Sequence, residues 1–201
     1  KKNNTITLNR TYQNTFGIYS NATHSATSIT TSATATTAAG ANSGTKVYSN
    51  TISNVNNGIV IVGPTATADA NTGVDIGGTS ALTGNTISNY GTTGTFSGYA
   101  NVSGTLNGIL VRNSIGFNVS FNTITSSAGG NTVTASQRAI FVPSFSNTPT
   151  GTFTNNINSN VISVQSGIAS GTVNGIIVES TTNTVTGTLN MNSNNFTTMN
   201  H

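Results

Sequence analysis

The chain has 201 residues, a formal net charge of +3 and only 4% charged residues, whereas an ordinary globular domain has roughly 25%. Its few cations are scattered along the chain instead of clustering as in a nucleic-acid binder. The absence of cysteine excludes a disulfide framework and a thiolate site. No apolar run approaches the roughly 18 residues of a membrane span. We expect one domain, residues 1–201, that forms a segment of a longer protein.

A first motif recurs along the whole chain: an aliphatic residue, two further residues, Asn, one residue, then Ile. It is partial at Asn4–Ile6 and returns at Val47–Ile52, Leu82–Ile87, Val119–Ile124, Ile157–Ile162 and Met191–Phe196. Thr, Val and Ile dominate these segments, their apolar residues alternate, and Gly and Asn flank them. This pattern is typical of short β-strands.

A second motif falls between successive copies of the first. It occurs at Gly17–Ser20, Gly58–Val62, Gly108–Arg112, Ala139–Pro143 and Gly175–Glu179. The variable segments 22–44, 64–80 and 88–107 are predicted to be surface inserts, and we assign no strands within them. A propeller blade of four antiparallel strands would have a similar repeat length, but Asn-Gly hairpin turns rarely link the two motifs. We therefore interpret each repeat as one coil of a parallel β-helix, a solenoid.

The recurring asparagine has the same parity as the isoleucine two residues later, so both side chains are expected to point inward. Equivalent positions of stacked coils lie roughly 4.8 Å apart. An inward Asn at a bend can bond to backbone groups and to the Asn of the next coil. We predict a structural ladder of side-chain amides formed by Asn4, Asn50, Asn85, Asn122, Asn160 and Asn194.

The same parity argument divides the remaining apolar residues into two rows. The inward row that precedes the ladder is predicted to contain Val47, Leu82, Val119, Ile157 and Met191. The outward row of the second motif contains Tyr19, Val60, Leu110, Phe141 and Ile177. Inserts folded over this outward row, or an unseen bulge, would account for it. The other hypothesis is a contact face for a partner chain, because large apolar patches mark interaction sites.

The two motifs resemble the parallel β-helix repeats that are widespread in pectate-lyase-like proteins. In its richness in Thr, Asn, Ser and Gly, the chain is most similar to repetitive secreted surface proteins of Bacteroidetes-type bacteria. The resemblance implies an all-β fold, a single-stranded right-handed parallel β-helix of about five to six coils with corner insertions. It also implies an extracellular or cell-surface location. It does not identify a function, because such helices carry lyases, hydrolases, adhesins and fibres.

Catalytic chemistry is not indicated. The chain has three carboxylates, Asp69, Asp75 and Glu179, whereas β-helix enzymes that cleave uronic-acid polymers need several acids and a placed base. We expect Glu179 and Arg112 to be solvated, weakly coupled surface charges two coils apart. His24 and His201 have no partners that would suggest a triad. We therefore predict that the chain is not an enzyme.

One short segment suggests a metal ion. Asp69, Asn71 and Asp75 supply oxygen atoms around Gly73, a spacing that suits calcium. The segment lacks the other ligands of a complete EF-hand loop. The other interpretation is a turn in which Asp and Asn bond to the nearby backbone. No other cofactor is expected.

We expect a non-catalytic extracellular structural or adhesive module, such as part of a bacterial adhesin, stalk or filament. Its partners would be further coils or domains of the same protein, neighbouring subunits, or surface glycans. A carbohydrate-binding module using Tyr90, Phe96 and Tyr99 is the alternative. A polysaccharide-degrading enzyme is a weaker alternative. An ice-binding protein is also a weaker alternative, because the Thr-x-Thr copies, such as those at Thr5 and Thr65, do not share one repeat position.

Overall fold

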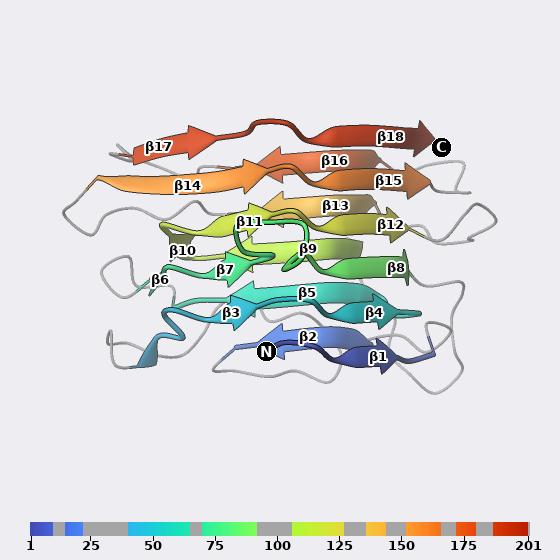
Figure 1. The fold of residues 1–201 in the computed structure, drawn as a ribbon, viewed down its shortest axis with the longest axis horizontal. Coiled ribbons are helices and arrows are strands. Elements are labelled where there is room, and N and C mark those ends of the chain that lie inside the picture. The colour runs from blue at the N-terminus through green and yellow to red at the C-terminus, as the bar shows by residue number, and fades with distance from the viewer. Residues whose placement is uncertain are drawn as a thin grey trace.

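The structure is a computed structural model that describes residues 1–9, 15–21, 40–64, 70–91, 106–126, 136–143, 152–165, 172–179 and 187–200. The regular elements within these ranges are all β-strands. Three long sheets contain most of them, and neighbouring strands within each sheet are parallel (Figure 1). The predicted all-β class with parallel strand pairing is therefore confirmed.

Sheet I has six strands, and each carries one copy of the Asn-x-Ile motif or follows directly from it. Its strand order is β1 (Thr5–Thr7), β4 (Thr51–Ser53), β8 (Thr86–Tyr90), β12 (Thr123–Ser126), β15 (Val161–Gln165) and β18 (Asn195–Asn200). The spatial order of the strands is the order in which they occur along the chain. Each new repeat is therefore added to the same edge of the sheet.

Sheets II and III follow the same rule with five strands each. Sheet II contains the second motif and comprises β2 (Phe16–Ser20), β5 (Asn57–Val62), β9 (Leu106–Arg112), β13 (Gln137–Val142) and β16 (Val173–Val178). Sheet III comprises β3 (Lys46–Val47), β7 (Asp75–Ile76), β11 (Asn118–Ser120), β14 (Phe153–Asn158) and β17 (Gly187–Asn190). A separate short pair joins β6 (Asn71–Thr72) to β10 (Ser114–Ile115).

The chain passes through the sheets in a fixed cycle, from sheet I to sheet II to sheet III and back to sheet I. We call one such passage a circuit. Sheets I and III lie end to end on one side of the molecule, and sheet II lies behind them with its strands running the other way across the view (Figure 1). The main apolar core contains inward side chains of all three sheets, for example Ile52, Ile59 and Ile76.

Strand register places equivalent residues of successive circuits beside one another. The isoleucines of the Asn-x-Ile motif form one continuous file, in which Ile52, Ile87, Ile124 and Ile162 are buried. The first file of the second motif contains Ile18, Ile59, Ile109 and Ile140, which are also buried. The two motifs thus supply the inward faces of sheets I and II, as their spacing predicts.

Two residues of the predicted inward row are not in the core. Leu82 is 89% exposed and Met191 is 47% exposed. The residue that pairs with both Val47 and Val119 is Ile76, because residues 77–84 form a loop between β7 and the ladder asparagine Asn85. Met191 follows β17 in the last circuit, where no further circuit covers it. The motif alignment was therefore wrong at Leu82, and the burial of Met191 was wrong.

The insert predicted over residues 64–80 contributes to the sheets. Both β6 and β7 lie within it, and β7 pairs with β3 and β11 in sheet III. The greater parts of segments 22–44 and 88–107 lie outside the described residues. Among the residues that are described, none belongs to a helix long and apolar enough to cross a membrane.

Candidate functional site

A left-handed residue precedes most of the ladder asparagines. The backbone angle φ is positive at Asn3, Ser49, Phe121, Ser159 and Ser193, each of which lies one position before an asparagine of the first motif. Left-handed backbone is costly for residues with a side chain, so the surrounding structure must hold it in place. At Ser49, Phe121, Ser159 and Ser193 the single left-handed residue turns the chain from sheet III into sheet I.

The asparagine after the turn links each circuit to the next. The Nδ2 atom of Asn50 donates to Oδ1 of Asn85 at 2.8 Å, and the backbone N–H of Asn50 donates to the same oxygen at 3.0 Å. Asn85 repeats both bonds to Oδ1 of Asn122, at 2.8 and 3.1 Å. The same pairs of bonds join Asn4 to Asn50, Asn122 to Asn160, and Asn160 to Asn194. The six predicted asparagines therefore form one uninterrupted hydrogen-bonded ladder.

The second amide hydrogen of each of these side chains fixes the bend. Nδ2 of Asn85 donates to the carbonyl oxygen of Val47 at 2.9 Å, and Nδ2 of Asn160 donates to that of Val119 at 2.9 Å. Asn50, Asn85, Asn122 and Asn160 are at most 1% exposed. Burying an amide is unfavourable unless its hydrogen-bonding groups are satisfied, and here they are. In these four residues the ladder is a structural feature, because their buried amides are already hydrogen-bonded within the protein.

A second asparagine pair was not predicted. Asn57 and Asn107 precede the glycines of the second motif, and both are buried. The backbone N–H of Asn107 donates to Oδ1 of Asn57 at 2.9 Å, and its Nδ2 donates to the same oxygen at 3.2 Å. The recurring Asn-Gly dipeptide at the start of the second motif was the available signal. The dipeptide lies before the strand of the second motif, where its asparagine can stack on the asparagine of the next circuit.

The outward row of sheet II forms a second apolar cluster, separate from the main core. Val60, Leu110 and Phe141 are buried in it together with Val62, while Tyr19 and Ile177 at the two ends of the row are half-buried. The prediction of an open partner face is therefore wrong for the three central members, because their apolar surface is already removed from water. The five residues of the row are nevertheless register partners on successive strands, as predicted.

The charges beside this cluster are less solvated than the sequence suggests. Arg112 is half-buried, and desolvation lowers the pKa of its guanidinium while the charge of Glu179 acts in the opposite direction. The same two effects act on the pKa of Arg138, whose guanidinium lies 3.9 Å from the ring centre of Phe141. The prediction of a freely solvated Arg112 is therefore wrong. Glu179 itself is exposed.

The predicted calcium ligands have different structural surroundings. Asp69 lies outside the described residues. Oδ1 of Asn71 accepts the backbone N–H of Asn42 at 2.8 Å. Asp75 accepts hydrogen bonds from the Tyr48 hydroxyl and from Nδ2 of Asn118, and Gly78 N–H donates to it at 3.1 Å. Burial, followed by the bond to Asp75, raises the pKa of Tyr48 to about 12.

These contacts favour a structural role for Asp75 as the anchor of the 77–84 loop. Within the described ranges, no group of three His, Cys, Asp or Glu side chains could hold a metal ion. The calcium site stays a prediction. His24 and His201 also lie outside the described residues.

The aromatic residues suggested for carbohydrate binding cannot form one platform that includes Tyr90. The Tyr90 side chain is completely buried in the main core, where desolvation raises the pKa of its hydroxyl. Phe96 and Tyr99 lie outside the described residues. A sugar-stacking surface requires an exposed ring face, so the contribution assigned to Tyr90 is wrong.

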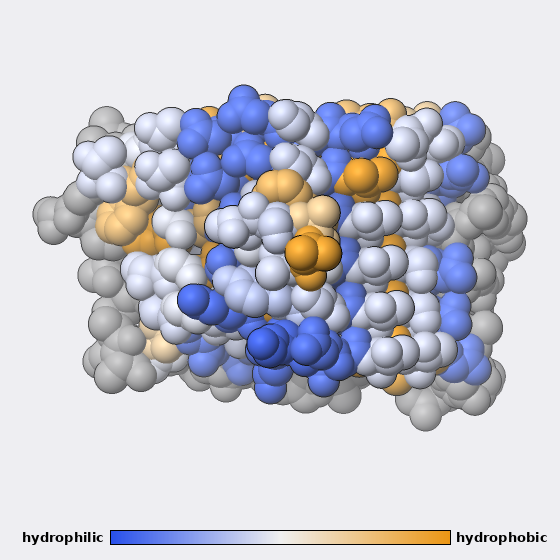
Figure 2. Space-filling view, in the orientation of Figure 1, coloured by the Kyte–Doolittle hydropathy of each residue, from blue (hydrophilic) through white to orange (hydrophobic). Residues whose placement is uncertain are grey.

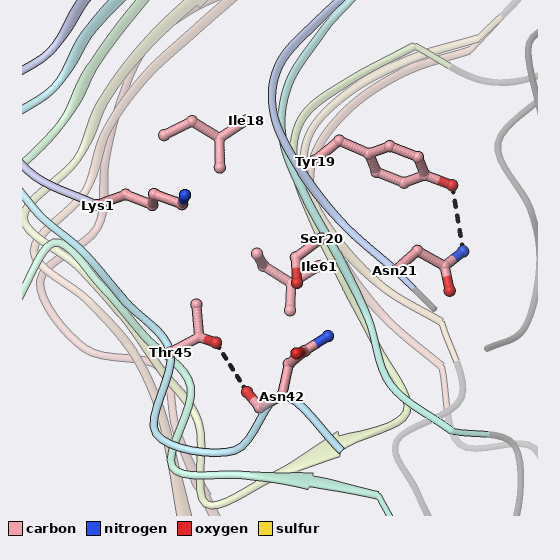
Figure 3. Close-up of a pocket in the computed structure, with 8 residues that line it drawn as sticks. All are labelled: Lys1, Ile18, Tyr19, Ser20, Asn21, Asn42, Thr45 and Ile61. Carbon is pink, nitrogen blue, oxygen red and sulfur yellow. Dashed lines mark hydrogen bonds between the residues drawn. The ribbon is translucent and has the colours of Figure 1, made fainter. Parts of the chain in front are cut away.

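A cavity opens at the first circuit, beside β2. Its lining includes the core residues Ile18 and Ile61 and the side chains of Lys1, Asn42 and Thr45 (Figure 3). The Thr45 hydroxyl donates to the carbonyl oxygen of Asn42 at 2.8 Å, and Nδ2 of Asn21 donates to the Tyr19 hydroxyl at 3.1 Å. Among the described residues of this lining, Lys1 is the one with a charged side chain. The described part of the lining therefore does not supply the pair of acid and base groups that hydrolysis or elimination requires.

Comparison with protein-family models, curated proteins and solved structures gave no match.

Proposed function

We propose that this chain is a right-handed parallel β-helix that serves as a non-catalytic structural or adhesive module of a bacterial cell-surface protein. The fixed cycle through three parallel sheets supports the β-helix, because each circuit then contacts only the circuits before and after it. Proteins built in this way extend by repetition and present long, regular surfaces. The extracellular location rests on the resemblance of the two motifs to secreted repeat proteins.

The observation that carries this proposal is the unbroken asparagine ladder. Each of the four inner ladder asparagines donates to the asparagine of the next circuit and accepts from that of the previous one, so the circuits have the same polarity. Such a unit can be repeated any number of times without a new type of contact. A rigid spacer or stalk needs this property, whereas an enzyme needs a site in which the repetition is broken.

The two ends of the stack support contacts with further coils or neighbouring subunits. Inward-facing side chains of the last circuit are exposed, and they include Leu189, Met191 and Phe196. Strands β1 and β18 each pair on one side only. An unpaired strand edge beside exposed apolar side chains favours the addition of another strand. We propose that this end of the stack binds the first circuit of a neighbouring copy.

Sedimentation velocity over a range of protein concentrations tests this contact. We expect the average mass to rise with concentration for the natural chain. The double variant Leu189→Asn, Met191→Asn should stay monomeric because it lacks the apolar end. Leu82→Asn is the matched control, since Leu82 is exposed in the 77–84 loop, and it should associate like the natural chain. A natural chain that remains monomeric throughout would contradict subunit stacking.

Cleavage of acidic polysaccharides would contradict the non-catalytic role.

A further inference from the structure

The outward side of sheet I carries two parallel files of hydroxyl groups. On four strands, the residue before the inward isoleucine is a threonine, and register aligns Thr5, Thr51, Thr86 and Thr123 in a first file. All four are exposed. Val161 and Asn195 occupy the same position on the last two strands. The Thr-x-Thr pattern alone does not reveal this alignment, because serine replaces threonine at the second outward position of several strands.

The second file lies two residues further along each strand. It contains Thr7, Ser53, Ser88, Thr125 and Ser163, and the hydroxyls of Thr7 and Ser53 are 2.9 Å apart. We call the two files together the hydroxyl face. Figure 2 shows it as pale columns of side chains that cross β4, β8 and β12 on the right-hand part of the molecule.

The face is regular in two directions. Parallel strands place neighbouring members of a file about 4.8 Å apart, and alternate residues of one strand are about 6.6 Å apart. Sheets normally twist, and flat ones are usually held by side-chain ladders. The asparagine ladder runs beside sheet I along its whole height, and the six strands lie nearly parallel in Figure 1. The lattice of hydroxyls is therefore held rigidly.

The hydroxyl face does not follow from composition alone. The equivalent outward file of sheet III contains Lys46, Asp75, Asn118, Asn156 and Asn190. The outward row of sheet II is apolar and largely buried. A chain in which Thr, Ser and Asn were placed at random would distribute hydroxyls over all three sheets. Sheet III has one exposed threonine pair in register, Thr154 and Thr188, whereas sheet I has files of hydroxyls that run over four and five strands. The described outward positions of sheet I carry no charged residue.

We propose that the hydroxyl face binds the surface of ice. A ligand that uses the whole face must itself repeat in two dimensions at similar intervals, and the oxygen rows of hexagonal ice do so. Each hydroxyl can both donate and accept a hydrogen bond, as water does. Threonine is stiff about χ1, so ordering water on this face immobilises little side-chain freedom. The threonine methyl groups between the hydroxyls order the adjacent water further.

A crystalline polysaccharide is also periodic, but the face lacks the means to bind one. Sugar rings pack on exposed aromatic rings, and no outward position from β1 to β15 in sheet I holds an aromatic residue. Charged side chains that would compete for liquid water are also missing from these positions. The observations therefore favour ice over a sugar polymer.

Two measurements on the whole chain test the proposal: the gap between the melting and growth temperatures of an ice crystal, and uptake of the protein into slowly grown ice. We expect the natural chain to open a gap and to enter the ice. Thr86→Tyr and Thr123→Lys place a bulky side chain on the face and should abolish both effects. Tyrosine suits an exposed strand position, and thermal unfolding followed by circular dichroism verifies that each variant is folded.

Thr154→Tyr is the matched control, because Thr154 is an exposed threonine on β14 of sheet III. It should behave like the natural chain. Exclusion of the natural chain from ice would overturn the proposal. Equal loss of activity in Thr154→Tyr, or full activity in both face variants, would also overturn it. Binding to crystalline cellulose or chitin that Thr86→Tyr removes, without uptake into ice, would assign the face to a polysaccharide instead.

Discussion

At the scale of single residues, the asparagine side chain carries most of the specificity of this fold. Asn85, for example, accepts two hydrogen bonds from Asn50 and donates to Asn122 and to the carbonyl oxygen of Val47. Leucine or isoleucine would fill the same volume but would leave the buried backbone groups of the turn unpaired. Such unpaired groups cost about 1–3 kcal/mol each. The amide therefore specifies where the chain bends and which circuit lies next to it.

Asn122→Ala tests this role. The change removes the acceptor used by Asn85 and the donor to Asn160 and to the carbonyl oxygens of Ile76 and Ser120. We expect the free energy of unfolding to fall by about 2–4 kcal/mol, measured by denaturant titration. Asn4→Ala is the control at the exposed end of the ladder, and it should cost about 1 kcal/mol or less. Equal effects of the two substitutions would contradict the ladder as the main polar support of the stack.

At the scale of elements, much of the architecture could be predicted from two motifs. The Asn-x-Ile motif predicted sheet I, and the glycine-led motif predicted sheet II, because both have long alternating patterns of apolar residues. Sheet III was harder to predict. Strands β3 and β7 have two residues each, too few for a period to be visible. Because the 77–84 loop separates Ile76 from Asn85, the spacing of the motif selected Leu82 as the inward residue instead of Ile76.

The candidate sites were predicted less well than the strands. Parity showed which side of a strand Val60, Leu110 and Phe141 occupy, but it could not show whether anything covers them. The hydroxyl face could not be predicted because it depends on strand register. Register places Ser53 and Thr125 in the same file although one is a serine and the other a threonine. Register describes which residues of two neighbouring circuits pair, so it cannot be read from the sequence of a single repeat.

The glycine that opens the second motif marks the closest approach between sheets I and II. A Cβ atom placed on Gly108 would lie 2.5 Å from Cγ2 of Ile124 and 2.7 Å from the carbonyl oxygen of Ala139. A Cβ atom on Gly58 would meet Ile87 in the same way. The isoleucine of one motif therefore packs directly over the glycine of the other, which explains why the two motifs occur together.

Gly108→Ala should therefore destabilise the chain by overpacking. We expect a decrease of about 1–3 kcal/mol in the free energy of unfolding, measured by denaturant titration. Ala139→Gly is the reciprocal control, because Ala139 occupies the equivalent position of the next circuit. It should cost about 1 kcal/mol or less, the loss expected from a glycine within a strand. A neutral Gly108→Ala would contradict the close packing of the two sheets.

At the scale of the whole molecule, the same circuit is repeated with three different outer surfaces. Sheet I presents hydroxyls, sheet II presents a largely buried apolar row, and sheet III presents amides with a few charges. The inner contacts stay constant while the outer residues differ between sheets. A stack of this kind can act as a spacer and can present a binding face without any change to its core. The proposed structural role and the proposed binding of ice by the hydroxyl face are therefore compatible.

The central claim is that equivalent residues of consecutive circuits lie beside one another. The chain contains no cysteine, so a pair of cysteines introduced at exposed positions can test it directly. Thr51 and Thr86 are register partners on adjacent strands, about 4.8 Å apart, whereas Thr51 and Thr123 are two circuits apart, or about 9.6 Å. A disulfide requires Cα atoms within about 7 Å. Under mild oxidation, followed by mass spectrometry, Thr51→Cys with Thr86→Cys should form an intramolecular disulfide, and Thr51→Cys with Thr123→Cys should not. The opposite result would contradict the stacking of circuits in register.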